Sequence, residues 1–291
     1  MEIIREIPLM RSYSERYLHK GRRVGLVPTM GSLHQGHLSL FDELRKGGCD
    51  VLGASIFVNP IQFGAGEDYD KYPRAESTDF TLLEEIGCDF VFCPVADDLF
   101  PRGFQSYIDV QELSKHLCGK YRAGHFRGVA TIVMKLFTIV RPTAAAFGLK
   151  DYQQALIINQ MVRDLNIDVE LRFGQTIRED DGLAMSSRNR YLSSSDRMAA
   201  TSIPQSLEWA RQYCKDRIRS SMEIIDGVRR ILKQFGEITI QYVEVVDPET
   251  LEPVEEVSER ALLAIAVYIG KTRLIDNAII GTDRKDELFG M

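Results

Sequence analysis

The sequence is 291 residues long, which at roughly 150 residues per domain predicts about two domains. Apolar residues make up 44% and charged residues 27%, a composition typical of folded globular proteins that excludes a disordered chain. The 36 basic and 42 acidic side chains give a net charge of −6, so no basic excess indicates binding to nucleic acid or to an anionic membrane surface.

Hydropathy and cysteine content predict a cytoplasmic protein without a membrane span. A spanning helix needs about 20 apolar residues, whereas the two most apolar stretches, residues 131–140 and 261–270, are far shorter. The first residues carry several charges and lack the apolar run of a secretory signal. The five cysteines include no C-x-x-C pair, so we expect reduced, mostly buried thiols.

The first half of the chain alternates short apolar runs with helical periods, the pattern of parallel strands joined by crossover helices. Strands are predicted at residues 24–27, 51–58, 89–93, 144–147 and 167–171. Helices are predicted from residue 76 or 77, over residues 128–140 and over residues 152–163. Pro28 is expected to end the first strand and Gly53 to interrupt the second. This order predicts an α/β fold with a Rossmann-like, doubly wound parallel sheet.

The pattern changes after residue 174. Two long helical stretches follow, at residues 195–215 and 220–235, and then three strands at residues 238–245, 261–268 and 273–280. Helices grouped before strands indicate a separate, smaller α+β domain. We therefore predict a first domain of residues 1–175 and a C-terminal domain of residues 176–291.

A segment with glycines and histidines follows the first predicted strand, where residues 28–38 read PTMGSLHQGHL. Here the carboxyl ends of parallel strands meet, and the next helix offers unpaired N–H groups to phosphate. His34 and His37 face the same way on a first helical turn. They can bind phosphate, ligate zinc, or merely cap and pack the helix. Because no third zinc ligand is evident and glycines lie beside them, the sequence favours a phosphate site.

This segment resembles the HIGH motif of the nucleotidyltransferase superfamily, and six further segments resemble, in order, the pantothenate synthetase (pantoate-β-alanine ligase) family. They are FVNPIQF at 57–63, DKYPR at 70–74, GHFRGV at 124–129, FGLKDYQQ at 147–154, MSSRN at 185–189 and GKTRLIDN at 270–277. The resemblance covers nearly the whole chain. It implies a first domain that binds nucleotide and pantoate, with the C-terminal domain as a lid.

The resemblance also implies an enzyme, an AMP-forming carbon–nitrogen ligase. In this reaction ATP adenylates the carboxylate of pantoate with loss of pyrophosphate, and the amine of β-alanine then displaces AMP to give pantothenate. Mg²⁺ is expected with the nucleotide, and a homodimer is the expected assembly. The expected partners are thus the small molecules pantoate, β-alanine and ATP, with neither nucleic acid nor a membrane.

Positive charge and hydrogen-bond donors suit this chemistry, because a carboxylate that attacks an α-phosphate brings two anions together. The residues expected to act in catalysis are His34, His37, Lys150 and Arg188. The resemblance makes His37 the general acid. The implied ATP-binding residues are Met30, Gly31, Ser32, Leu33, His34, Gln35, Gly36, His37, Gly148, Leu149, Lys150, Asp151, Ile177, Met185, Ser186, Ser187 and Arg188. Asp151 can also cap a helix, and residues 185–189 can also form an exposed polar loop.

Gln62 and Gln154 resemble the amide pair that the family uses on the oxygens of pantoate, since an amide both donates and accepts hydrogen bonds. Met30 and Phe63 can form an apolar wall for the gem-dimethyl group of pantoate, or can belong to the core. Asn59 either reaches the ribose or phosphate of a substrate or shapes a turn.

Asp79 is the one candidate ligand for Mg²⁺, although a solvated helix face is the commoner place for such a carboxylate. Two other functions stay open. An adenylyltransferase of the same superfamily would need further basic residues and no Gln62 and Gln154 pair. An idle nucleotide-binding or scaffolding protein would lack the polar residues that the motifs contain. The sequence therefore favours the ligase.

Overall fold

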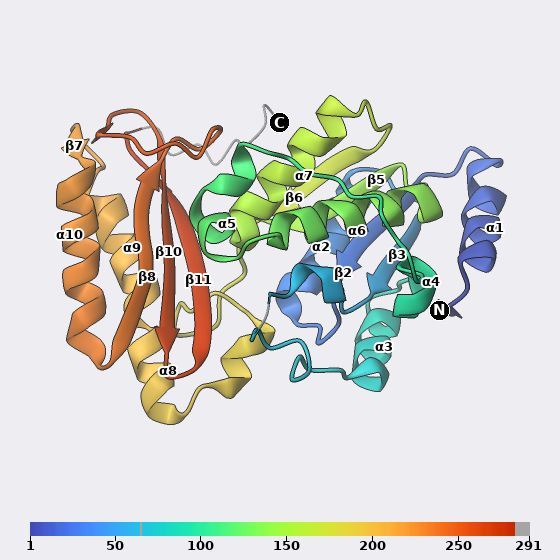
Figure 1. Ribbon diagram of the computed structural model, residues 1–291, viewed down its shortest axis with the longest axis horizontal. Coiled ribbons are helices and arrows are strands. Elements are labelled where there is room, and N and C mark those ends of the chain that lie inside the picture. Colours follow the sequence, from blue (N-terminus) through green and yellow to red (C-terminus); the bar gives the residue numbers. More distant parts are fainter. Residues whose placement is uncertain (65, 283–291) are drawn as a thin grey trace. The chain divides into compact units, whose positions relative to one another are not determined.

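The computed structural model describes residues 1–64 and 66–282, and the chain divides into two compact units (Figure 1). The first unit consists of residues 1–114, 119–149 and 154–177. The second unit begins with two short segments, residues 115–118 and 150–153, and continues from residue 178. In the described parts of the chain, no helix is long and apolar enough to cross a membrane.

The first unit contains a parallel sheet of six strands. Their order across the sheet is β1 (Glu2–Ile4), β4 (Phe90–Phe92), β3 (Val51–Ile56), β2 (Val24–Thr29), β5 (Ala144–Gly148) and β6 (Glu170–Gly174). The chain begins at the edge strand β1, crosses to β2 in the middle, continues outward through β3 to β4, and returns to β5 on the other side of β2. This order confirms the predicted doubly wound α/β fold. It places the topological switch point, where such sheets bind ligands, at the carboxyl ends of β2 and β5.

Helices cover both faces of this sheet. The helices of the first unit include α1 (Ile7–Leu18), α2 (Gln35–Lys46), α3 (Glu76–Glu85), α4 (Ala96–Leu99), α6 (His125–Val140) and most of α7 (Tyr152–Asp164). Phe41 of α2 and Leu83 of α3 belong to one core cluster with Val91. Tyr13 of α1 contacts the ring of Phe90 instead. Since adjacent strand residues point to opposite faces, α1 lies on the face opposite α2 and α3.

Several boundaries in the first unit differ from the prediction. Strand β2 continues through Pro28 to Thr29, because its pairing with β5 covers only Gly25 and Leu26 and needs no N–H from Pro28. Gly53 does not interrupt β3. A Cβ at this position would lie 2.1 Å from the Phe90 ring, so glycine lets that ring pack on the strand.

Two other elements are displaced along the sequence. Helix α6 begins at His125 rather than residue 128, after Gly124 at φ 77°. Strand β6 covers Glu170–Gly174 rather than residues 167–171. The apolar run that predicted β6 starts just after α7, and its first residues form the connection. Asn166 there has a φ of 50°.

The second unit is the predicted α+β fold. An antiparallel sheet has the order β11 (Thr272–Ile280), β10 (Ala261–Ile269) and β8 (Ile238–Val246). Helices α9 (Ser202–Tyr213) and α10 (Ser221–Leu232) pack against it and share its apolar core. A short pair, β7 (Arg219–Ser220) and β9 (Glu256–Val257), completes the strands of the described residues.

The predicted helix at residues 195–215 is two helices. Helix α8 (Ser194–Ala200) ends before Thr201, and α9 begins at Ser202. Pro204 lies in the first turn of α9, where its missing N–H costs nothing, whereas it would break the interior of one long helix. The buried positions continue at helical spacing across this break, so the sequence pattern did not indicate two helices.

Candidate functional site

The turn after β2 has a backbone that few sequences can adopt. Gly31 has a φ of 79° and Ser32 a φ of 53°, both in the left-handed region. The Gly31 N–H donates to Thr29 Oγ1 (3.1 Å). The N–H groups of Ser32 and Leu33 donate to Asp79 Oδ2 (2.8 Å) and Oδ1 (2.7 Å). The carboxylate of α3 thus fixes the turn that leads from β2 into α2.

Asp79 is therefore not on a solvated helix face, and that prediction is wrong. The residue is only 1% exposed, because its carboxylate points into the β2–α2 turn. Both oxygens already accept backbone N–H groups. No cluster of three or more His, Cys, Asp or Glu residues suited to a metal ion occurs in residues 1–64 and 66–282. The geometry consequently gives Asp79 a structural role and no support as a magnesium ligand.

His34 and His37 cap the N-terminus of α2. His34 Nδ1 accepts the Gly36 N–H (3.1 Å), and His37 Nδ1 accepts the His34 N–H (3.3 Å), which together form a reciprocal capping box. The two ring centroids are 4.1 Å apart. A ring nitrogen that accepts a hydrogen bond carries no proton, so each neutral ring has its proton on Nε2. Capping and phosphate binding are thus compatible, since the caps use Nδ1 and Nε2–H is a donor.

A second polar cluster follows β3. Asn59 Nδ2 donates to Gln62 Oε1 (2.9 Å) and to the Gly128 carbonyl (3.1 Å), and Gln62 Nε2 contacts Met30 Sδ (2.9 Å). Asn59 and Gln62 are 1% and 8% exposed. Asn59 Oδ1 is buried without a hydrogen-bond partner, and such an acceptor is a place where a ligand donor can bind. The turn prediction and the substrate prediction for Asn59 are both consistent with this geometry.

The backbone of Gln62 is held by the motif at residues 124–129. His125 Nδ1 donates to the Gln62 carbonyl (2.8 Å), because its Nε2 accepts from Arg122 Nη1 (2.8 Å). Arg122 also makes two hydrogen bonds to Glu67, of 2.7 and 2.6 Å. Burial raises the pKa of the Glu67 carboxyl, but the Arg122 hydrogen bonds and charge outweigh burial, so this pKa lies below its ordinary value.

The FGLKDYQQ motif lies at the end of β5, the other strand of the switch point. Leu149 is buried, and the Lys150 ammonium lies 3.6 Å from Asp151 Oδ2. The Lys150 carbonyl accepts a hydrogen bond from Asn277 Nδ2 (2.9 Å). Gln153 is structural, since it bonds the backbone of His116 and Cys118, whereas Gln154 is half-buried on α7.

The MSSRN motif is a short, ordered turn. Ser186 Oγ accepts the Arg188 N–H (3.3 Å) at the start of a 3₁₀ helix, Ser187–Tyr191, and Ser187 is 7% exposed. Asn189 Nδ2 donates to Glu179 Oε1 (2.6 Å) and to the Ala184 carbonyl (3.0 Å). The motif is therefore not merely an exposed loop.

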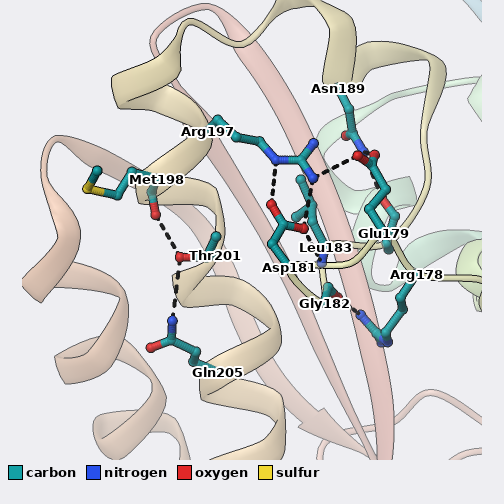
Figure 2. Close-up of polar contacts among 11 residues, drawn as sticks. Arg178, Glu179, Asp181, Gly182, Leu183, Asn189, Arg197, Met198, Thr201 and Gln205 are labelled. Atoms are coloured by element: carbon teal, nitrogen blue, oxygen red, sulfur yellow. Dashed lines mark hydrogen bonds and ion pairs between the residues drawn. The ribbon is translucent and has the colours of Figure 1, made fainter.

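Arg197 of α8 fixes the other side of this turn (Figure 2). Its guanidinium donates to Glu179 Oε2 (2.7 Å) and to both oxygens of Asp181 (2.6 and 2.8 Å). The Arg197 hydrogen bonds lower the pKa of the Asp181 carboxyl. Burial raises the pKa of Glu179, but its bonds to Arg197 and Asn189 outweigh burial and lower that pKa as well. Arg197 was not among the predicted site residues, because no local spacing relates it to the motif.

The predicted site residues belong to both compact units. Those in the first unit are residues 30–37, Asn59, Gln62, Phe63, Asp79, Gly148, Leu149, Gln154 and Ile177. Those in the second unit are Lys150, Asp151, Met185, Ser186, Ser187 and Arg188. Phe63 contacts the rings of Tyr69 and Tyr72, so it is part of an aromatic cluster.

The strand order defines an α/β protein with a doubly wound parallel sheet, and the turn from β2 into α2 places a helix N-terminus, capped by two histidines, at the switch point. The sequence profile of pantoate-beta-alanine ligase matches residues 2–279. The chain belongs to the pantoate-beta-alanine ligase family, whose members are ligases.

Relatives of known name are similar over nearly their whole length. The chain is 48% identical to pantothenate synthetase from Thermotoga petrophila, over 97% of this chain and 100% of the relative. It is also 48% identical to the Geobacter sulfurreducens enzyme, over 98% and 100%. The Thermus thermophilus pantothenate synthetase structure is 40% identical with a TM-score of 0.87 and covers 95% of this chain and 98% of that one.

A solved ligand complex is also similar. The pantoate-beta-alanine ligase of Francisella tularensis, crystallised with beta-gamma ATP and beta-alanine, is 34% identical with a TM-score of 0.79. The match covers 95% of this chain and 97% of that one.

Proposed function

We propose that the protein condenses pantoate with β-alanine to give pantothenate, using ATP and forming a pantoyl-adenylate on the way. The observation that carries the proposal is the N-terminus of α2 at the switch point, where two imidazoles present Nε2 donors. Family membership supports it, as does the Francisella complex with ATP and β-alanine.

In the first step, a carboxylate oxygen of pantoate attacks the α-phosphorus of ATP, and the bond to pyrophosphate breaks. Negative charge on the transferred and leaving phosphates increases as this happens, so donors fixed in advance are effective. His34 and His37 supply Nε2–H groups, with His37 as the general acid, and the α2 N-terminus adds its dipole. Lys150 and Arg188 supply the positive charge, and residues 30–37, 148–151, Ile177 and 185–188 bind ATP.

In the second step, the amine of β-alanine attacks the acyl carbon, AMP leaves, and the amine loses a proton. Gln62 and Gln154 orient the oxygens of pantoate beforehand. Asn59 Nδ2 donates a hydrogen bond to Gln62 Oε1 and so fixes the orientation of the Gln62 amide. The Nε2 group of Gln62 is then directed toward Met30 and the substrate. Met30 and Phe63 form the apolar wall for the gem-dimethyl group.

Mg²⁺ is expected to arrive with the nucleotide. The described side chains contain no metal cluster, and Asp79 uses both of its oxygens on backbone N–H groups, so they do not form a magnesium site on their own. We therefore assign no step to the ion. The division of labour between a nucleotide-binding domain of residues 1–175 and a lid of residues 176–291 is part of the proposal. The homodimer and the cytoplasmic location stay predictions.

Exchange of radiolabelled pyrophosphate into ATP tests this function. We expect exchange only when pantoate is present, and release of AMP only after β-alanine is added. Exchange without pantoate, or AMP release that does not depend on β-alanine, would contradict the proposal and favour an adenylyltransferase. His37→Ala should slow exchange at least tenfold, equivalent to about 1.4 kcal/mol of transition-state stabilisation. A rate within twofold of the parent would remove His37 from the mechanism.

A further inference from the structure

The proposed function gives no role to the GKTRLIDN motif. From Thr272 onward this segment lies on β11, and it ends in two adjacent polar residues, Asp276 and Asn277. Neighbours on the same strand, such as Leu274, Ala278 and Ile279, are buried and apolar. Asp276 is nevertheless 2% exposed. A buried carboxylate is costly unless it is paired, and apolar residues would serve the core equally well. The pair therefore needs another explanation.

Asn277 contacts the backbone of a proposed catalytic residue. Its Nδ2 donates to the Lys150 carbonyl over 2.9 Å, and residues 150–153 belong to the same compact unit as β11. The two residues are 127 positions apart in the chain. This hydrogen bond fixes the main chain from which the Lys150 ammonium extends.

Asp276 contacts the loop that carries the other proposed cation. Its Oδ2 accepts from Arg178 Nη1 (2.7 Å) and its Oδ1 from Arg178 Nη2 (3.1 Å), a two-point pair of defined orientation. Asp276 Oδ1 also accepts the Asn277 N–H (2.8 Å), which joins the two polar residues to each other.

Arg178, held by Asp276, also contacts the turn before the MSSRN motif. Arg178 Nη1 donates to the Gly182 carbonyl (3.0 Å), as Figure 2 shows, and its backbone forms a bridge with Ala184. The Ala184 carbonyl in turn accepts from Asn189, the residue that follows Arg188. A chain of hydrogen bonds therefore connects Asp276 to the start and the end of this motif.

We propose that Asp276 and Asn277 are positioning residues for phosphate binding. Asn277 orients the Lys150 segment, and Asp276 orients the loop of Ser186–Arg188 through Arg178. One strand thus holds both cation-bearing segments in a fixed relation within the second unit. This inference rests on the proposed function, because that function assigns Lys150 and Arg188 to ATP.

Asn277→Ala tests the positioning role, with Tyr152→Phe as the matched control. Tyr152 Oη donates to the Pro248 carbonyl (3.0 Å) and so holds the same segment to the same unit away from Lys150. We expect Asn277→Ala to raise the KM for ATP or lower kcat in pantoate-dependent exchange, with a combined loss in kcat/KM of at least fivefold. Tyr152→Phe should change kcat/KM by less than twofold, even if both variants lower the thermal midpoint equally. Equal kinetic effects of the two variants would overturn the inference.

A second pair of variants keeps the test decisive. Asn277→Asp has the same shape but places a carboxylate against the Lys150 carbonyl, so it should lose at least as much activity as Asn277→Ala. Asp276→Asn should raise the KM for ATP above that of the parent protein, since Arg178 loses its charged partner. A fully active Asn277→Asp enzyme would contradict the assignment.

Failure of the proposed function is distinguishable from failure of this inference. If the parent protein shows no pantoate-dependent exchange, the proposed reaction is wrong. The positioning role is then read from ATP itself, by calorimetric titration of the parent protein and of Asn277→Ala. A fivefold weaker Kd in the variant, with Tyr152→Phe unchanged, would still confirm positioning, and equal Kd values would exclude it.

Discussion

At position 31, both the backbone geometry and the packing of neighbouring side chains require glycine. Its φ of 79° favours glycine, and a Cβ there would lie 2.9 Å from Asp79 Oδ2 and 3.0 Å from Ile56 Cγ2. The sequence motif predicted that glycine would lie close to a ligand. The structure adds that glycine is needed on the protein side, because the Asp79 carboxylate comes from α3 and occupies that space.

Gly31→Ala should therefore lower the free energy of unfolding by more than backbone strain alone would. Gly21 is the matched control, since its φ is 70° and a Cβ there would meet nothing within 4 Å. We expect Gly21→Ala to cost about 1 kcal/mol of unfolding free energy. Gly31→Ala should cost about 1–3 kcal/mol more, from displacement of Asp79. Urea unfolding of both variants measures the difference, and equal losses would show that the contact with Asp79 is unimportant.

Among the elements, the sequence predicted those with strong periodicity and missed contacts made over long separations. Helix α6 and strands β10 and β11 were predicted within a few residues, because α6 has apolar positions at helical spacing and the two strands are short runs rich in apolar residues. His34 and His37 were selected as candidate site residues from their local spacing, and Gln62 from the resemblance to the family. Asp79, Arg197 and Asn277 bond to residues far away in the sequence: Arg197 to residues 16 and 18 positions away, Asp79 to residues 46 and 47 positions away, and Asn277 to a residue 127 positions away. No local pattern contains that information.

Arg197 joins α8 to the turn before the MSSRN motif, and this gives the protein a pH-dependent stability. The pKa values of Glu179 and Asp181 are lowered from their ordinary 4.5 and 3.8 in the folded protein. Their contribution is therefore fully present above those ordinary values and is lost as the pH falls through the lowered ones. We expect the stability difference between the parent protein and Arg197→Gln to be constant from pH 8 to about 6 and to shrink as the pH falls toward about 3.

Chemical unfolding across this pH range measures the effect. Arg141→Gln is the control, because Arg141 pairs with Glu15 over 3.4 Å with side chains 59% and 46% exposed, and such pairs contribute little. The difference for Arg141→Gln should stay near zero throughout. A difference for Arg197→Gln that does not change with pH would contradict the assigned role of the two carboxylates.

At the scale of the whole molecule, a net charge of −6 provides no general attraction for ATP. Binding must then depend on local groups, and the proposed ones come from both compact units: the α2 N-terminus from the first, and Lys150 with residues 185–188 from the second. If residues of both units bind one nucleotide, then ATP should reduce the local motion of the binding segments in both units. Loss of a cation in one unit should then weaken the effect of ATP on the binding segment in the other unit.

Hydrogen–deuterium exchange of the full chain tests this dependence. ATP should slow amide exchange at residues 31–38 and 185–190 of the parent protein, while helix α10 (Ser221–Leu232), which contains no proposed site residue, should be unaffected. In Arg188→Ala, at an ATP concentration near the parent Kd, protection should fall at residues 31–38 as well, because occupancy of the common ligand falls. Full protection of residues 31–38 in that variant would mean that the α2 N-terminus binds ATP without Arg188, and the proposed set of ATP residues would be wrong.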